Sequence, residues 1–282
     1  MKKFLKKHLL TLAIVVIFIV GLCILLYPTV SDYFNSRNQS RVVASYREAV
    51  DRLDPRYIEE MFAAAHEYNV RLRTKQNRFE FTEEDYIEYN SLLNVDTGTN
   101  SVIGTLEISL LGIMLPIYHG TGDAVLQVAL GHFEGTSLPV GGLGTHTVIT
   151  GHRGLPSALL LTEIDRLENG DIFVIHVLNE TLTYQVDQVV IVEPTDFSEL
   201  GIDLSMDYAT LLTCTPYGIN THRLLVRGHR IENEAAEEIV RRLVVLSEAR
   251  QLSEGHALLI ILVPVLILLI ITKLILYLRK SR

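Results

Sequence analysis

The sequence predicts a mainly β domain, either a closed barrel or a sandwich, held between two membrane-spanning helices. Apolar segments with almost no charge lie near both ends of the 282-residue chain. Between them, from about residue 102 to 231, short runs of Val, Ile and Leu alternate with Gly, Pro, Asn and Asp, which is typical of strands joined by turns. About seven or eight short strands without regular helices between them favour an all-β fold.

The first apolar segment, residues 9–27, carries no charge and follows four lysines within the first seven residues. As a helix it would be about 28 Å long, close to the hydrocarbon thickness of a bilayer. A cleaved signal peptide has the same order of charge, but its apolar core is usually about 7–15 residues long. No clear small-residue cleavage site follows Tyr27. We therefore expect residues 1–28 to be an uncleaved tail and anchor, with a cleaved signal as the alternative.

The second apolar segment, residues 257–278, is interrupted only by Lys273, which can extend toward the interface. Pro264 is a candidate kink, and three basic residues follow the segment. Positive charge thus lies between each segment and the nearer end of the chain. By the positive-inside rule, both termini are expected in the cytoplasm and the middle of the chain outside the cell. This predicts a cell-membrane protein with two spans. The alternative, a buried pair of core helices, is disfavoured by their length and low charge.

Charge separates the middle of the chain from its ends. Eight of the 25 Lys and Arg lie in or beside the two apolar segments, whereas all 33 acidic residues lie between them. The middle therefore has 17 basic and 33 acidic residues, a net charge of −16 against −8 for the whole chain. A nucleic-acid-binding surface has the opposite sign, so no nucleic-acid partner is expected. An acidic module outside the membrane suits a protein or peptide partner.

Residues 29–90 are predicted to form a helical arm. Asp54 and Pro55 are typical of a helix cap and first turn, and apolar residues recur at helical spacing after them. Thr82, with Asp85 three residues later, predicts another helix start.

Residues 91–231 are predicted to form the main domain, 232–256 an amphipathic linker helix, and 257–282 the second span and a basic tail. Residues 156–166 are expected to form a helical insert. The candidate strands are Val102–Ile108, Leu111–Tyr118, Thr147–Thr150, Asp171–Leu178, Thr181–Val192, Tyr208–Cys214 and Arg223–Arg230.

Cys214 is the one cysteine of the middle region, since Cys23 lies in the first apolar segment. It ends a predicted strand, and Pro216 and Gly218 follow it at once. An unpaired thiol outside the membrane is unusual. It is explained by burial, by pairing with another molecule or by catalysis. As a nucleophile the thiol needs a base or a positive environment, because a free thiol is mostly protonated at neutral pH.

His152 and Arg223 are the candidate partners of this thiol. His152 follows a strand and a glycine, so its ring can project from a loop, although spacing alone does not select it among the nine histidines of the middle region. No histidine or cysteine spacing favours a metal site. Arg223 begins a strand nine residues after Cys214. A fixed cation beside a carbonyl under attack stabilises the oxyanion, whereas the plain alternative is a surface ion pair.

These residues together resemble a known family. Thr-Leu-Leu-Thr-Cys214-Thr-Pro, Arg223 nine residues later and Thr-Gly-His152-Arg upstream are similar to the active-site signature of the sortases over residues 90–231. The helical arm, Ser91-Leu-Leu-Asn-Val95 and a C-terminal span resemble class C sortases, which polymerise pilins.

The resemblance implies a closed eight-stranded β-barrel and a transpeptidase that needs no cofactor. Cys214 would hold the acyl part of an LPXTG-like signal as a thioester, His152 would transfer the protons, and Arg223 would hold the carbonyl or its oxyanion. Thr213 and Thr150 are expected to contact the substrate. The partners would be pilin subunits, and the acceptor would be a lysine amine of the next subunit. The alternative acceptor is a lipid-linked cell-wall precursor, as in housekeeping sortases of Gram-positive bacteria. An extracellular hydrolase and a non-enzymatic scaffold are the remaining alternatives.

One feature departs from class C sortases, many of which cover the cysteine with an Asp-Pro-aromatic lid. Residues 69–90 contain no Asp-Pro pair, and Asp54-Pro55 comes too early and precedes arginine. We expect the site to be open, or to be covered differently by residues 71–81.

Overall fold

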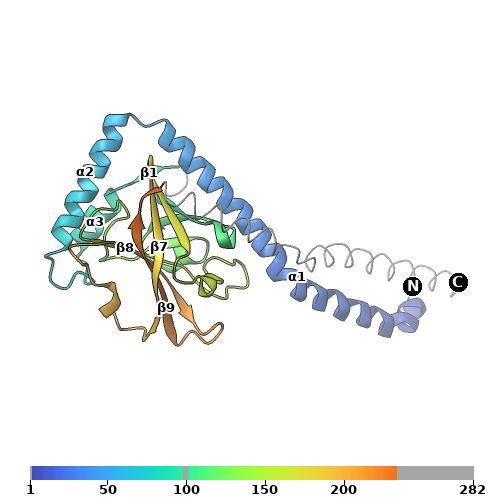
Figure 1. Ribbon diagram of the computed structural model, residues 1–282. Coiled ribbons are helices and arrows are strands. Elements are labelled where there is room, and N and C mark those ends of the chain that lie inside the picture. Colours follow the sequence, from blue (N-terminus) through green and yellow to red (C-terminus); the bar gives the residue numbers. More distant parts are fainter. Residues whose placement is uncertain (1, 98–100, 234–282) are drawn as a thin grey trace. The chain divides into compact units, whose positions relative to one another are not determined.

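The computed structural model describes residues 2–97 and 101–233 (Figure 1). Nine strands form one sheet in the order β1-β2-β3-β4-β5-β8-β9-β7-β6. The strands are β1 (Val95–Asp96), β2 (Ser101–Ile108), β3 (Ile113–His119), β4 (Leu130–His132), β5 (Thr145–Thr150), β6 (Ile172–Val177), β7 (Glu180–Val192), β8 (Asp207–Thr215) and β9 (His222–Ile231). The last strand of this order, β6, also pairs with β2, so β2 to β9 close into an eight-stranded barrel. The predicted closed barrel is therefore confirmed.

Two parallel pairs interrupt an otherwise antiparallel barrel. β3 pairs in parallel with β4, and β5 pairs in parallel with β8. A parallel neighbour requires a long connection, because the chain must return to the same end of the sheet. Between β5 and β8 that connection contains β6, β7 and the loops before and after them. The carboxyl ends of β5 and β8 consequently lie at the same edge of the sheet.

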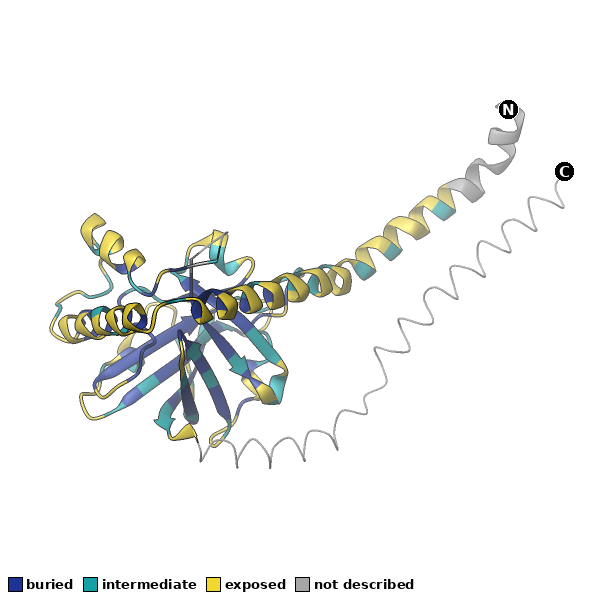
Figure 2. Cartoon of the chain, turned by 90° about the horizontal axis from the view of Figure 1, so that it is seen from above, coloured by how far each residue is buried: buried dark blue, intermediate teal, exposed yellow. Residues whose placement is uncertain are grey.

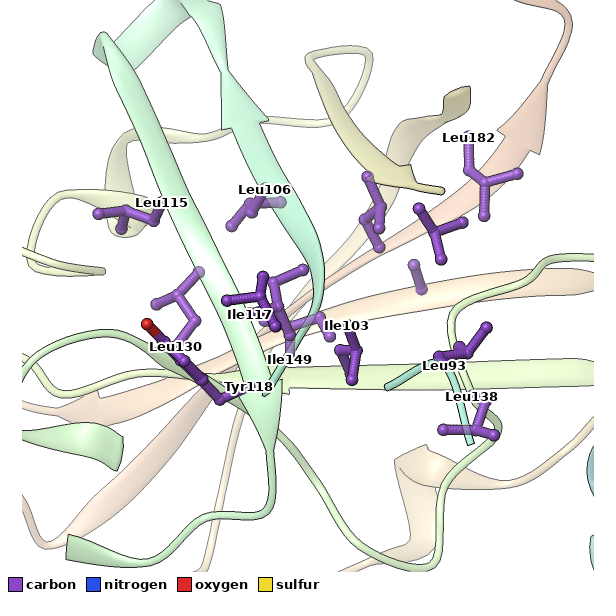
Figure 3. Close-up of a cluster of buried hydrophobic side chains, with 14 of the residues drawn as sticks. Leu93, Ile103, Leu106, Leu115, Ile117, Tyr118, Leu130, Leu138, Ile149 and Leu182 are labelled. Atoms are coloured by element: carbon purple, nitrogen blue, oxygen red, sulfur yellow. The ribbon is translucent and has the colours of Figure 1, made fainter. Parts of the chain in front are cut away.

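The interior of the barrel is filled by aliphatic and aromatic side chains from opposite strands. Ile103 and Leu106 of β2, Ile117 of β3 and Ile149 of β5 are all fully buried, and Figure 3 shows them directed toward one another. Ile103 and Leu106 are three residues apart, and both reach the interior because a register shift between Val102 and Gly104 interrupts the alternation of β2 there. Each such buried residue contributes roughly 1.5–3 kcal/mol of transfer free energy.

Three helices precede the barrel: α1 (Lys2–Asp51), α2 (Pro55–Leu72) and α3 (Glu83–Ser91). The predicted caps are confirmed: the Asp54 side chain accepts from the Arg56 N–H, and Thr82 and Asp85 form a capping box. Figure 2 shows that the outward faces of α1 and α2 are exposed while the strands are largely buried.

The C-terminal half of α1 is bonded to the barrel. The Tyr46 hydroxyl donates to the Ile103 carbonyl at 3.2 Å and accepts from the Leu178 N–H at 2.8 Å. Gln39 donates to the Val128 carbonyl at 2.8 Å. Earlier in the same helix lies an apolar stretch long enough to cross a membrane, with its side chains unburied. The described part of the chain thus contains one candidate span.

Several elements differ from the sequence-based expectations. Residues 156–166 form turns and only one short 3₁₀ helix, η2 (Ile164–Arg166), instead of a helical insert. The strand expected from Leu111 begins at Ile113, after the 3₁₀ turn η1 (Ser109–Leu111). β4 and the short helix α4 (Asp123–Leu126) were not predicted. The predicted linker helix and second span lie outside the described residues.

Candidate active site

Cys214 lies one residue before the end of β8 and points away from the barrel interior. Ala209, Leu211 and Thr213 alternate with it and are at most 1% exposed, because they face the core. Cys214 itself is half-buried on the opposite face. The strand ends at Thr215. The thiol is therefore neither a core side chain nor, within the described residues, part of a disulfide.

Arg223 lies directly opposite Cys214. The antiparallel register of β8 and β9 pairs these two residues, so their side chains leave the same face of the sheet. Opposed residues of this kind have Cβ atoms about 4.5–5.5 Å apart. One guanidinium nitrogen of Arg223 donates to the carbonyls of His222 and Asn220, at 3.1 and 3.4 Å. Within the described residues no carboxylate pairs with Arg223, so its charge is available to an anion beside the thiol.

His152 reaches the same edge of the sheet through β5. The parallel register aligns Thr150 with Leu212, and the Gly151 N–H extends the pairing by donating to the Leu212 carbonyl at 3.2 Å. The Thr213 hydroxyl donates to the Gly151 carbonyl at 2.8 Å. These bonds hold the chain on both sides of Gly151 against β8, so His152 leaves the sheet beside the end of the cysteine strand.

A glycine is required immediately before His152. A Cβ atom at Gly151 would lie 2.6 Å from Leu130 and 2.9 Å from Leu161, which is closer than side-chain contacts allow. The absence of a side chain lets this loop pass over the core. The ring of His152 is half-buried and forms no hydrogen bond with any described residue, so no carboxylate in the described chain orients it.

Thr150 and Thr213, the predicted substrate contacts, use their hydroxyls within the fold. Thr150 donates to the Leu212 carbonyl at 3.2 Å, and Thr213 to Gly151 as described above. Both side chains are buried. Their observed contacts align β5 with β8, and a contact with substrate stays a prediction.

Arg153, the residue after His152, has a role that was not predicted. Its side chain is only 9% exposed and forms an ion pair with Asp165 of η2. It also donates to the Thr215 hydroxyl at 3.3 Å, while its Nε atom is buried without a partner. Arg153 thus joins the histidine loop to the end of the cysteine strand. The only signal in the sequence is a basic residue directly after the candidate histidine.

The buried histidines are distinguished from His152 by their environment. His132 donates from Nε2 to the Ser137 carbonyl, so its Nδ1 accepts from the Tyr89 hydroxyl, and burial lowers its pKa to about 3. His146 is fixed between the Gly201 carbonyl and Thr210, and burial lowers its pKa to about 4. Burial likewise lowers the pKa of His119 to about 4. These rings stay neutral and structural at physiological pH.

Four further histidines with described side chains lie elsewhere, and one of them, His66, stacks on Phe62 of α2. His222 is adjacent to Arg223 but lies on the other face of β9 by strand alternation, and it is 3.3 Å from a carboxylate oxygen of Glu193. His176 and His229 are close to Glu107 and Asp187, respectively. Among the described histidines, His152 therefore remains the candidate proton carrier for Cys214.

An apolar cluster lies on the outer face of the sheet and begins at Leu212, two residues before Cys214 on the same face of β8. Val148, Leu200 and Leu225 are almost fully buried there, with Leu212 packed against them. This group, the outer cluster, is completed by Phe79, Phe133, Val190 and Val192. The Phe79 ring stacks on Phe197 with centroids 4.9 Å apart.

Comparison with known proteins agrees with this geometry. A model of the sortase domain matches residues 106–231. Sortase C1 from Streptococcus agalactiae is 45% identical, with a TM-score of 0.65 over 68% of this chain and 98% of that one. Sortase C from Streptococcus pneumoniae, described with regard to pilin substrate specificity, is also 45% identical, with a TM-score of 0.60 over 68% and 97% of the two chains.

The chain belongs to the sortase family. Sortases are cysteine transpeptidases, and the match indicates that class of enzyme. A more distant sortase, sortase D of Bacillus subtilis (strain 168), is 26% identical over 136 residues, which cover 47% of this chain and 66% of that protein. The eight-stranded barrel is thus that of a sortase.

Replacing Arg153 with methionine is expected to lower the turnover number for transpeptidation about 10- to 100-fold with little change in KM. Methionine keeps much of the side-chain volume but releases the histidine loop from Thr215 and Asp165, and small displacements of a reacting group cost rates of that order. The matched control is Arg166→Met, which removes the exposed ion pair between Arg166 and Glu163. Steady-state kinetics and thermal melting check this. Equal turnover in both variants, or a loss explained by unfolding, would contradict the positioning role.

Proposed function

We propose that this sortase is a membrane-anchored, pilin-polymerising transpeptidase. It cleaves an LPXTG-like sorting signal after its threonine and transfers the acyl group to a lysine amine of another pilin subunit. The observation that carries the chemistry is the pairing of Cys214 with Arg223 beside the tethered loop of His152. The similarity to sortase C1 and to the sortase C described with pilin specificity supports pilins as the substrate class.

The first half of the reaction forms a thioester. His152 takes the proton of the Cys214 thiol, and the resulting thiolate attacks the threonine carbonyl, whose oxygen becomes an oxyanion beside the Arg223 guanidinium. Removing one such oxyanion donor typically costs about 10²–10³ in rate. As the peptide bond breaks, His152 donates a proton to the departing amine. The acyl group then remains on Cys214 and the C-terminal part of the signal leaves.

The second half transfers the acyl group to the acceptor. An incoming lysine amine attacks the thioester while His152 removes its proton, and the thiolate of Cys214 is the leaving group. One amide bond is lost and one is gained, so the overall exchange is nearly isoenergetic and requires no cofactor. Release of the acyl group to water would instead make the protein a hydrolase, and a lipid-linked cell-wall precursor as acceptor would make it a housekeeping-type enzyme.

We place the catalytic residues outside the cell membrane. Residues 1–28 would form the first anchor, 29–90 the arm, 91–231 the catalytic barrel, 232–256 a linker and 257–282 the second anchor, with both termini in the cytoplasm. The apolar stretch of α1 supports the first anchor. The lysines before it and the basic tail at the other end support this orientation.

The central prediction is a thioester on Cys214. The full-length protein in nanodiscs, incubated with an LPXTG-type peptide, is expected to gain the mass of the acyl fragment. An added amine should discharge the adduct into a new amide. Intact-protein mass spectrometry checks this, with Cys23→Ala as a variant that keeps the adduct and Cys214→Ala as one that loses it. An adduct persisting in Cys214→Ala would refute the assignment, and discharge to water alone would favour the hydrolase.

We further propose that the site has no Asp-Pro-aromatic lid. In place of such a lid, residues 71–81 lie against another part of the barrel. Arg73 donates to the carbonyls of Leu143 and Gly144, and Arg78 donates to the carbonyl of Leu200. Among the described residues, no hydrogen bond or ring contact of this segment reaches His152, Cys214 or Arg223. The segment covers the outer cluster and leaves the thiol partly exposed.

An open site predicts that reagent size has little effect on modification of Cys214. In a Cys23→Ala background, a bulky maleimide and a small one are expected to react with Cys214 at rates within about one order of magnitude, as for an accessible thiol. Phe79→Ala should leave their ratio unchanged. A strong selective protection against the bulky reagent, relieved by Phe79→Ala, would show that residues 71–81 act as a lid after all.

A further inference from the structure

The loop that follows Arg153 is uncharged and docks on α1. Residues 154–162 read Gly-Leu-Pro-Ser-Ala-Leu-Leu-Leu-Thr. The Leu159 N–H donates to the Asp32 carboxylate at 2.9 Å, and Asn35 donates to the Ser157 carbonyl at 2.6 Å. Two bonds from adjacent turns of one helix therefore fix this loop, which we call the docking loop, to α1.

These bonds lie very close to the end of the apolar stretch of α1. Asp32 is the first Asp, Glu, Lys or Arg after Lys7 and comes five residues after Tyr27. At 1.5 Å per residue, its Cα lies only about 7–8 Å along the helix from the last residue of the apolar segment. The polar interface on each side of a bilayer is itself roughly 5–8 Å thick. If α1 spans the membrane, Asp32 and its bonded loop lie at the level of the lipid headgroups.

The rest of α1 prevents the barrel from moving away from this level. Beyond Asn35, Gln39 and Tyr46 bond the same helix to the barrel at Val128, Ile103 and Leu178, as described above. α1 continues as one helix through Pro28. The height of the barrel above the bilayer is thus set by a helix that is attached at successive points and not by a flexible linker.

The docking loop presents apolar side chains outward. Ala158, Leu160 and Leu161 are buried, whereas Leu159 is 55% exposed and Pro156 is also exposed. Leu160 has a left-handed backbone conformation, with a φ of 40°. The chain turns there, between the exposed side chain of Leu159 and the buried side chain of Leu160. At the same level of α1, Tyr33 and Phe34 are 59% and 64% exposed. Aromatic residues are enriched at membrane interfaces, where their rings tolerate both lipid and water.

We propose that the docking loop is a membrane-contact surface, with Leu159 and Pro156 resting in the headgroup region of the outer leaflet. The partner is a phospholipid bilayer. This inference rests on the proposed membrane anchoring by α1. The strongly acidic middle region would be repelled by an anionic membrane surface. The docking loop has no charged residue, so it can contact such a surface without this repulsion. Because the docking loop continues from His152 and Arg153, the candidate site is held close to the bilayer.

The chain contains no tryptophan, which allows a direct test. Leu159→Trp would introduce a single indole into the full-length protein, reconstituted in nanodiscs whose lipids are brominated near the headgroup end of the acyl chains. Bromine quenches an indole that touches it. We expect roughly half of the Leu159→Trp emission to be lost relative to unbrominated lipid, as for a side chain about 5–10 Å into the interface. Pro156→Trp is expected to behave alike.

Two matched variants make the outcome decisive. Leu25→Trp lies in the apolar stretch and should be quenched whenever α1 is inserted. Leu204→Trp is 69% exposed in the loop before β8 and should keep its emission. Quenching of Leu25→Trp without quenching of Leu159→Trp or Pro156→Trp would overturn the contact while leaving the anchor intact. No quenching of Leu25→Trp would overturn the anchor and the membrane contact together.

Discussion

The parallel pairing of β5 with β8 is the constraint on which the candidate site depends. Parallel strands end at the same edge of a sheet, so the loop that carries His152 emerges beside the strand that carries Cys214. The antiparallel pairing of β8 with β9 then brings Arg223 back to face the thiol. Three residues separated by up to 71 positions in the chain are thus assembled by two strand registers. A slip of one residue in either register would turn a side chain to the opposite face.

The polar groups around the site stabilise these registers. Thr150 and Thr213 donate to backbone carbonyls where β5 gives way to the histidine loop, and Arg153 joins the loop to Thr215 and Asp165. Buried donors and acceptors that find such partners fix a single arrangement, because an unpaired one would cost about 1–3 kcal/mol. His152 itself has no described hydrogen-bond partner. The fold therefore places its backbone firmly while its ring is not bonded to any described residue.

The sequence predicted those parts that have a strong local pattern. Alternation revealed the strands that end at Cys214 and begin near Arg223, and the spacing of Thr82 and Asp85 predicted a helix start, where these two residues form a capping box. The three-residue strand β4 was missed because it is defined by its neighbours and not by its own composition. Residues 156–166 have helical composition but fold as a loop, since their bonds go to α1. The role of Arg153 depends on contacts with distant residues that no local pattern shows.

The most direct test of this account is the single-turnover rate of Cys214 acylation in four proteins: wild type, His152→Ala, Arg223→Ala and the double variant. If the three residues form one site, each single change should slow acylation by about 10²-fold or more, and the double change should cost far less than the product of the two losses. The structure predicts this non-additive pattern. Acylation by Arg223→Ala at nearly the wild-type rate, or losses that simply multiply, would contradict it.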